Sequence, residues 1–184
     1  MKTKQVHLLR RPENIAVEDF ILREVELSAL QDGQVLVQNL YMSIDPYMRR
    51  SMENDGKDLD PWPINDALDG PSIGRVIETR NSKYSVGDIV ESMSGWQQYF
   101  ISNAEDYVPY LAANDALVKR AIGNGAEPMD YLGLLGIASQ TAYSAMMCAI
   151  KLVPGETVVI SSGAGSVGSL ACQIAKIHGS RVVT

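Results

Sequence analysis

The residues best suited to chemistry form a glycine-rich turn at 163–168, between a β-branched run and an apolar-periodic helix. From Thr157 to His178 the chain reads TVVISSGAGSVGSLACQIAKIH. A strand, a G-x-G-x-x-G turn and a helix in this order predict a dinucleotide-binding loop, whereas the glycines alone are a weak signal. The helix start offers unpaired N–H groups and partial positive charge to a pyrophosphate. The residues expected at the phosphates are Gly163, Ala164, Gly165, Ser166, Val167 and Gly168.

Each glycine of this turn has an expected role. Gly163 is expected to supply the tight turn, Gly165 to let the backbone approach a pyrophosphate, and Gly168 to let helix and strand pack closely. A purely structural turn is the alternative, but the glycine spacing after a strand favours nucleotide contact. The residue that separates NAD from NADP follows the second strand of such a unit. That position lies beyond Thr184, so the residues present leave both cofactors open.

The metal-ligating residues are few and scattered. The chain has two cysteines, Cys148 and Cys172, and two histidines, His7 and His178, near opposite ends. Catalytic zinc needs three protein ligands and an open position, and structural zinc needs four closely spaced ligands. We therefore expect no metal site and disfavour a zinc alcohol dehydrogenase.

The elements that must position the glycine turn change character near residue 125. Up to about residue 103, short β-branched runs separated by turn residues predict a β-rich, barrel-like domain. The segment 51–71 is rich in Pro, Gly and acidic residues and is expected to be a long exposed loop. Pro128 can begin a short helix, and a second helix is expected from Ser139, as N-cap, to Ile150. The fold class is therefore mixed α/β, with domains at 1–125 and 126–184.

Composition and charge narrow the classes of partner. The formal net charge is −6 and the pI about 4.9, and adjacent basic residues occur only in isolated pairs such as Arg49-Arg50. Nucleic acid and anionic membranes are therefore not expected partners. The N-terminal residues lack the apolar core of a signal peptide, and no apolar run reaches the roughly 18 residues of a membrane span. A cytoplasmic location is the expectation.

Several further motifs occur in a consistent order along nearly the whole chain. They are YMSIDPYMR at 41–49, GRVIE at 74–78, Y-x-V-G-D-x-V at 84–90, G-W-Q-x-Y at 95–99, LG at 135–136, TAY at 141–143 and QIAK at 173–176. With the glycine turn, they resemble the zinc-independent alkenal/enone reductase branch of the medium-chain dehydrogenase/reductase superfamily. The resemblance implies a GroES-like β-barrel domain followed by the truncated start of a Rossmann doubly wound sheet.

The resemblance also implies site residues outside the glycine turn. Tyr47 would project its phenol into the substrate cleft; the alternative is a core tyrosine whose hydroxyl finds a buried partner. Pro46, Ile137 and Thr141 would neighbour the nicotinamide, and packing within a helix is an equal alternative for Ile137. The chain departs from the family where Ile137-Ala138-Ser139-Gln140 replaces a Met-Pro-Gly-like sequence.

The function implied is that of an NADP(H)-dependent oxidoreductase that reduces the C=C bond of α,β-unsaturated aldehydes and ketones. The resemblance favours NADP(H), a small enone or enal substrate and a homodimer of the full-length protein. Family members are nearly twice as long, so the present chain is expected to be an inactive fragment. Two alternatives stay open: an NADPH quinone reductase of the same superfamily, and a non-catalytic nucleotide-sensing or interaction protein.

Overall fold

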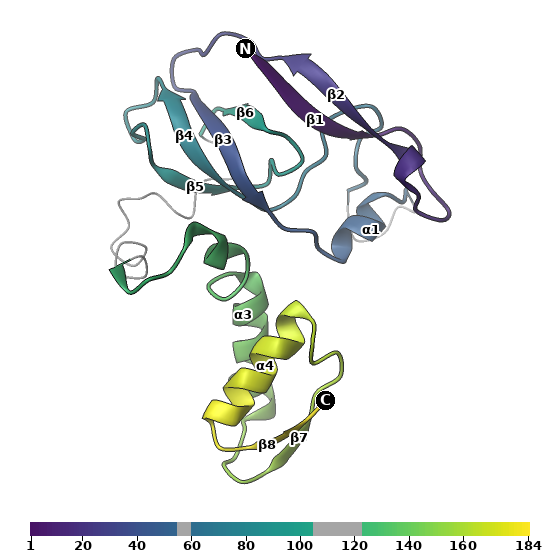
Figure 1. The fold of residues 1–184 in the computed structure, drawn as a ribbon, viewed down its shortest axis with the longest axis vertical. Coiled ribbons are helices and arrows are strands. Elements are labelled where there is room, and N and C mark those ends of the chain that lie inside the picture. The colour runs from purple at the N-terminus through teal and green to yellow at the C-terminus, as the bar shows by residue number, and fades with distance from the viewer. Residues whose placement is uncertain (55–59, 105–122) are drawn as a thin grey trace. The chain divides into compact units, whose positions relative to one another are not determined.

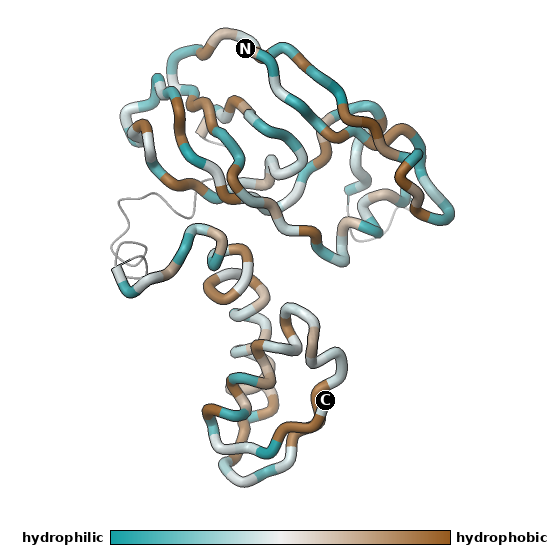
Figure 2. The backbone as a smooth tube through the Cα atoms, in the orientation of Figure 1, coloured by the Kyte–Doolittle hydropathy of each residue, from teal (hydrophilic) through white to brown (hydrophobic). Residues whose placement is uncertain are grey.

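A computed structural model describes residues 1–54, 60–104 and 123–184 of the chain (Figure 1). The chain divides into two compact units, Met1–Ala126 and Glu127–Thr184. The expected boundary between residues 125 and 126 lies one residue from this division. Hydrophobic and hydrophilic stretches alternate along the backbone of both units (Figure 2).

The first unit contains a hairpin and a four-stranded sheet. β1 (Lys2–Leu8) pairs antiparallel with β2 (Phe20–Glu26), and a 3-10 turn, η1 (Val17–Asp19), precedes β2. The sheet has the order β5-β4-β3-β6, with antiparallel neighbours. Its strands are β3 (Val35–Met42), β4 (Ser72–Thr79), β5 (Ile89–Ser92) and β6 (Tyr99–Ser102). Single bridges such as Gln5↔Gln97 connect the hairpin to the segment before β6.

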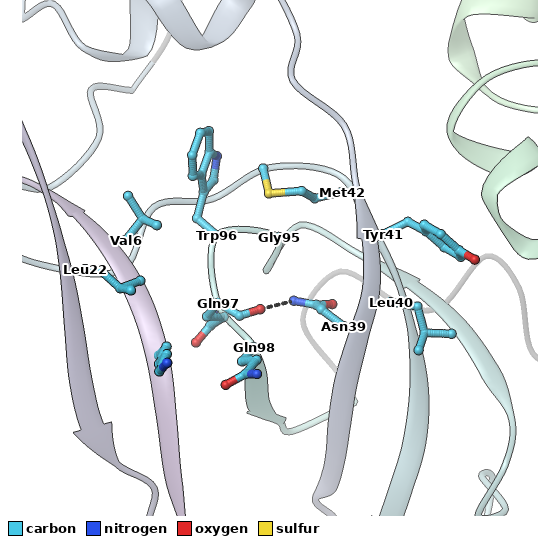
Figure 3. Close-up of a pocket in the computed structure, with 11 residues that line it drawn as sticks. Val6, Leu22, Asn39, Leu40, Tyr41, Met42, Gly95, Trp96, Gln97 and Gln98 are labelled. Carbon is cyan, nitrogen blue, oxygen red and sulfur yellow. Dashed lines mark hydrogen bonds between the residues drawn. The ribbon is translucent and has the colours of Figure 1, made fainter. Parts of the chain in front are cut away.

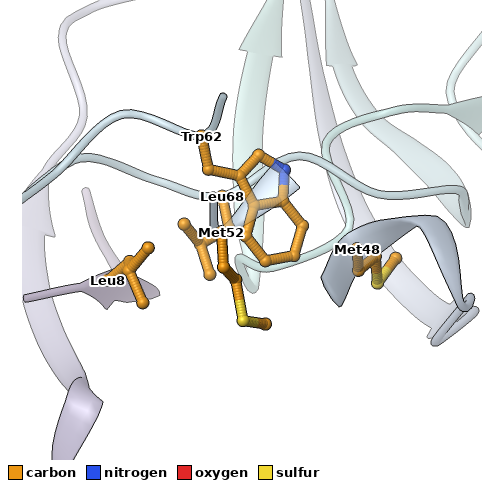
Figure 4. Packing of buried hydrophobic residues seen from close by; sticks show 5 residues of the cluster. All are labelled: Leu8, Met48, Met52, Trp62 and Leu68. Carbon is orange, nitrogen blue, oxygen red and sulfur yellow. The ribbon is translucent and has the colours of Figure 1, made fainter. Parts of the chain in front are cut away.

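Two apolar clusters hold this unit together. The sheet cluster takes its members from β3, β4, β5 and β6, because their β-branched and aromatic residues fit a pleated, buried surface. It consists of Val35, Val37, Val76, Val90 and Phe100. The second cluster lies beneath the short helix α1 (Tyr47–Ser51) and consists of Leu8, Met48, Met52, Trp62 and Leu68 (Figure 4).

The segment 51–71 differs from its expected character as an exposed loop. Residues 55–59 lie outside the described chain, but the side chains of Trp62 and Leu68 are only 2% and 1% exposed. The main-chain N–H of Trp62 also donates to the carbonyl of Ser51 at 2.7 Å. The expectation holds for residues 60, 61, 63–66 and 69, which are exposed, and is wrong for Trp62 and Leu68, whose large apolar side chains gain free energy from burial.

An ion pair between the exposed Arg10 and the buried Asp19 fixes the connection between β1 and β2. Asp19 is buried, and its carboxylate accepts a hydrogen bond from Arg10 Nε at 2.6 Å and one from the Ala16 N–H at 2.9 Å. The hydrogen bond from Arg10 and then that from Ala16 lower the pKa of Asp19, and burial opposes them. Because the folded pKa lies below the unfolded one, this stabilisation is present above about pH 4 and is lost as pH falls through the folded pKa.

We therefore expect the substitution Asp19→Asn to lower the urea midpoint of the chain at pH 7. The difference from the wild type should shrink as the pH falls from about 4 through the lowered pKa of folded Asp19, because the wild-type carboxylate becomes protonated over that range. Urea unfolding followed at pH 7, 5 and 3 measures both effects. Asp32→Asn is the matched control. Asp32 is fully exposed and lies 3.7 Å from Arg80, and an exposed ion pair of this kind contributes little to the free energy of unfolding. A midpoint difference that does not change with pH would contradict the linkage.

The second unit is a pair of packed helices against two parallel strands. Its elements are η2 (Pro128–Leu132), α3 (Ile137–Tyr143), which continues as the π-helical η3 (Ser144–Ile150), β7 (Thr157–Val159), α4 (Ser166–Ile177) and β8 (Arg181–Val183). β7 and β8 are parallel neighbours. The small residues Ala142, Ala171 and Ala175 lie in one buried cluster with Met146 and Leu152.

The predicted helix starts are correct in one case and wrong in the other. Pro128 begins η2, where its missing N–H costs nothing. The second helix begins at Ile137 with Gly136 as N-cap, three residues before the expected N-cap Ser139. The reason lies in Gly136: a Cβ there would overlap the carbonyl oxygen of Tyr131, so only glycine permits this close turn between the helices.

Candidate functional site

The glycine turn joins β7 to α4, as its sequence context predicts. Gly165 is the N-cap of α4, with φ −77° and ψ 169°, and its N–H donates to the Ser162 carbonyl at 2.8 Å. No side chain of the described chain caps this helix start, and its first turn carries no acidic residue. The first amides of α4 therefore have no partner within the helix and remain free to bind an anion.

The six residues expected at the phosphates lie together on this turn and the first turn of α4. Residues 164–167 are exposed, so their backbone is open to a ligand. At Gly168, an added Cβ would overlap the Ser162 carbonyl, which explains why the helix and the turn can approach this closely only with glycine here. At Gly165 the nearest atom to an added Cβ is the same oxygen, at 3.2 Å. Exposed backbone, a helix N-terminus and a surface without a Cβ at Gly165 fit a dinucleotide pyrophosphate.

The role expected of Gly163 needs a correction. The positive φ of the turn occurs at Ser162, with φ 53°, and not at Gly163. Gly163 is required for a different reason, because a Cβ there would overlap the side chain of Thr184. The turn therefore depends on a serine in the left-handed region, which costs roughly 1–2 kcal/mol relative to ordinary backbone.

Ile137 and Thr141 lie one turn apart on α3. Ile137 is 69% exposed, so packing within its own unit does not account for it. Thr141 is exposed too, and its hydroxyl donates to the Ile137 carbonyl at 2.8 Å. Its oxygen still has acceptor capacity for a ligand. An exposed apolar side chain beside a hydroxyl acceptor is a surface that a flat, amphipathic ring can contact.

Tyr47 and Pro46 belong to the first unit, and the other expected site residues to the second. Pro46 is exposed and is the N-cap of α1, where its fixed φ suits a helix start. Tyr47 is half-buried, and its hydroxyl is buried with no hydrogen-bond partner among the described residues. The alternative of a core tyrosine with a satisfied hydroxyl therefore does not hold within the described chain.

The surroundings of Tyr47 keep its phenol protonated. Burial, followed by the negative charges of Asp69 and Asp45, raises the pKa of Tyr47 to about 12. A raised phenol pKa means that the O–H remains a hydrogen-bond donor at every physiological pH. The arrangement therefore supplies a neutral donor in a partly dehydrated position.

Two tryptophans belong to or pack against the same apolar cluster as Tyr47. The rings of Trp62 and Trp96 meet edge to face, with centroids 6.0 Å apart and an interplanar angle of 75°. The Trp62 indole N–H donates to the Asp69 carboxylate. The Trp96 indole N–H is buried without a partner in the described chain, and Trp96 and Tyr47 both pack against the cluster beneath α1.

A pocket of about 420 Å³ is lined in part by Trp96 (Figure 3). Its walls come from β1, β2, β3 and the turn before β6, and the Asn39 amide donates to the Gln97 carbonyl at 2.7 Å across it. The sequence motifs include Trp96 but miss the contributions of β1 and β2. A strand pattern shows which residues share a face, but not that a hairpin folds over a second sheet. The lining residues are Lys4, Val6, Leu22, Asn39, Leu40, Tyr41, Met42, Gly95, Trp96, Gln97 and Gln98.

The described residues contain neither a candidate metal cluster nor a candidate membrane-spanning helix. In the part of the chain that the structure describes, no three His, Cys, Asp or Glu side chains gather as a metal ion would require. No helix within residues 1–54, 60–104 and 123–184 combines the length and the apolar character needed to cross a bilayer.

A β unit followed by a βαβ unit with a nucleotide-type glycine turn is the domain order of a medium-chain dehydrogenase/reductase. Residues 4–110 match the family model described as the N-terminal domain of oxidoreductase. The chain belongs to this oxidoreductase family, and its resemblance to the alkenal/enone reductase branch is confirmed by the relatives that follow.

Three curated relatives match over most of the chain. Prostaglandin reductase 1 from Bos taurus is 36% identical over 181 residues, 98% of this chain and 50% of the relative. NADPH-dependent curcumin reductase from Escherichia coli (strain K12) is 36% identical over 178 residues, 96% of this chain and 48% of the relative. The NADP(+)-dependent 2-alkenal reductase of Nicotiana tabacum is 34% identical over 153 residues, 82% of this chain and 41% of the relative. The chain thus spans about half the length of these relatives.

Solved structures confirm the predicted fold class. The crystal structure of CurA from Vibrio vulnificus superimposes with a TM-score of 0.81 at 27% identity, covering 98% of this chain and 50% of CurA. The structure of CurA in complex with NADPH gives the same TM-score at 28% identity, covering 97% and 50%.

Proposed function

We propose that the protein to which these residues belong is an NADP(H)-dependent reductase of the C=C bond in α,β-unsaturated aldehydes and ketones. The observation that carries this proposal is the Tyr47 hydroxyl, a buried donor without a partner among the described residues. The activities for which the relatives are named, which include an alkenal reductase and a curcumin reductase, support the same chemistry. Their NADP dependence, and NADPH bound to CurA, favour NADP(H) as the cofactor.

In this proposal, the glycine turn binds the cofactor pyrophosphate through the first amides of α4, while Ile137 and Thr141 contact the nicotinamide ring. NADPH, when bound, supplies a hydride. The alkene accepts that hydride at its β-carbon, and the π electrons move onto the carbonyl oxygen to give an enolate. The Tyr47 O–H donates a hydrogen bond to this oxygen as its charge develops. The α-carbon then takes a proton from solvent, so that one hydride and one proton saturate the bond.

The position of a transferred deuterium tests the proposal. The complete polypeptide is incubated with trans-2-nonenal and NADPH carrying deuterium at C4, and the product is analysed by NMR. We expect nonanal with deuterium at its β-carbon, because the hydride goes to the electron-poor end of the alkene. A labelled allylic alcohol would place the hydride on the carbonyl carbon and contradict the proposal.

The same assay separates the alternatives. A quinone reductase would consume NADPH with a benzoquinone and leave nonenal unchanged, and a nucleotide sensor would bind NADPH without turnover of either. The 184-residue chain assayed alone is the control, and we expect it to give no turnover, since it spans only half the length of its relatives. We also keep, as proposals for the complete protein, a homodimer and a cytoplasmic location.

A further inference from the structure

The helix that begins with Tyr47 is too short to hold its own position. α1 contains five residues, Tyr47–Ser51, about 7.5 Å of helix at 1.5 Å per residue. Isolated helices of this length are unstable in water, so contacts from other segments must fix it. On its inner face, Met48 and Met52 pack into the cluster with Trp62 (Figure 4).

The guanidinium of Arg11, in the β1–β2 connection, hydrogen-bonds the C-terminal end of this helix. Arg11 Nη1 donates to the carbonyl oxygens of Met52, at 3.2 Å, and Glu53, at 3.3 Å. Its Nη2 donates to the carbonyl oxygen of Trp62 at 3.0 Å. Met52 is the C-cap of α1, so Arg11 places a positive charge and two donors where a helix end presents unpaired carbonyls.

The two chain segments that Arg11 joins are also bonded to each other. The Trp62 N–H donates to the Ser51 carbonyl at 2.7 Å, and the Trp62 ring packs against Met48 and Met52. The Arg11 side chain, the main chain at Trp62 and the end of α1 are therefore each hydrogen-bonded to the other two. The planar guanidinium holds donors on two nitrogens in fixed directions toward the two segments, whereas an ammonium group presents its three donors from a single nitrogen.

We propose that Arg11 is a positioning residue for Tyr47, an inference that rests on the proposed function. By fixing the C-terminal end of a one-turn helix, Arg11 sets the direction in which the phenol at the other end points. A rigid segment about 7.5 Å long transmits a displacement at one end to the other. Reactions that depend on an oriented donor lose about 100-fold in rate for a displacement of about 1 Å.

The test compares Arg11→Lys in two backgrounds of the complete polypeptide. With NADPH and trans-2-nonenal, Arg11→Lys is expected to lower kcat about 10- to 100-fold while the KM for NADPH stays unchanged. In the Tyr47→Phe background, the same substitution should have no further effect on kcat, because the group it orients is gone. Arg23→Lys is the matched control, since Arg23 is exposed and donates a hydrogen bond to the Asn65 amide oxygen at 3.3 Å, with no link to α1 among the described residues.

Each other outcome has a defined meaning. Equal losses in both backgrounds would show that Arg11 acts on the structure generally, and this would overturn the inference. An unchanged kcat in Arg11→Lys, with a reduced one in Tyr47→Phe, would overturn the inference and leave the proposed function standing. An unchanged kcat in Tyr47→Phe alone would remove Tyr47 from the proposed function. Should the lysine variant fail to fold, Arg11→Gln, which keeps two N–H donors, supplies the same comparison.

Discussion

Replacing Tyr47 by phenylalanine is expected to lower kcat of the complete polypeptide about 100-fold without destabilising it. The loss of rate follows from removing one preorganised donor at a developing oxyanion, typically about 10²- to 10³-fold. Stability should instead rise, by about 1 kcal/mol, because the wild-type hydroxyl is buried and unpartnered within the described chain and its desolvation penalty disappears. Lower activity with equal or greater stability is the signature of a group retained for chemistry.

The pH dependence of the wild type follows from the same environment. With a pKa of about 12, the phenol of Tyr47 stays protonated where an ordinary tyrosine titrates, near pH 10. The ratio of wild-type to Tyr47→Phe rates should therefore be constant from pH 6 to about pH 10. A ratio that falls with a midpoint near 10 would mean that the hydroxyl is more hydrated than the structure shows.

Steady-state rates and urea unfolding of both proteins measure these effects. Tyr84→Phe is the matched control, because burial and the charge of Asp88 also raise the pKa of Tyr84, but in the sheet cluster. We expect this variant to keep full activity. A Tyr47→Phe protein that is clearly less stable would show that the hydroxyl has a partner in the complete fold, which is the role of a core tyrosine.

Two alanine substitutions in the glycine turn should separate folding from cofactor binding. At Gly165, alanine can adopt the observed φ and ψ, although its Cβ would meet the Ser162 carbonyl oxygen at 3.2 Å, closer than an ordinary van der Waals contact. We expect stability to fall by less than about 1 kcal/mol, because the contact is tight but does not overlap. The methyl group nevertheless stands where the pyrophosphate approaches the backbone, so the Kd for NADPH should rise at least about tenfold.

At Gly168, alanine is expected to affect stability more than NADPH binding. A Cβ would overlap the Ser162 carbonyl, so helix and turn must separate, and a loss of about 1–3 kcal/mol is expected, as for other overpacked sites. NADPH binding weakens as a secondary result. Thermal unfolding and NADPH fluorescence titration of the complete polypeptide give both quantities. Gly123→Ala is the control, because its φ is not positive and an added Cβ there meets nothing within 4 Å. Wild-type NADPH affinity in Gly165→Ala would remove the turn from the binding site.

The parts of the fold that depend on neighbours in sequence were predictable. The strand, glycine turn and helix from Thr157 to Ile177 follow from local periodicity, and the turn lies where the sequence places it. The short helix at Pro128 follows from the fixed φ of proline. In both cases the chain segment itself contains the residues that determine its conformation.

The parts that depend on distant contacts were not predictable. Trp62 and Leu68 lie in a segment whose composition is typical of an exposed loop, and only their packing against α1 and β1 reveals a core. The positive φ at Ser162 could not be predicted, because a serine in the sequence does not indicate a left-handed backbone. Arg11 carries no motif, because its partners are main-chain carbonyls of residues about 40 to 50 positions away. Tyr47 was identified by family resemblance, but its unpartnered hydroxyl required coordinates.

The edge-to-face tryptophan pair has a practical consequence for spectroscopy. Trp62 and Trp96 are the two tryptophans of the chain, and both belong to the first unit. Intrinsic emission at 295 nm excitation therefore follows the loss of this unit alone, whereas far-ultraviolet dichroism also follows the helices of the second. Recorded on one sample, the two signals give separate unfolding curves for the β unit and for the whole chain, with no label added.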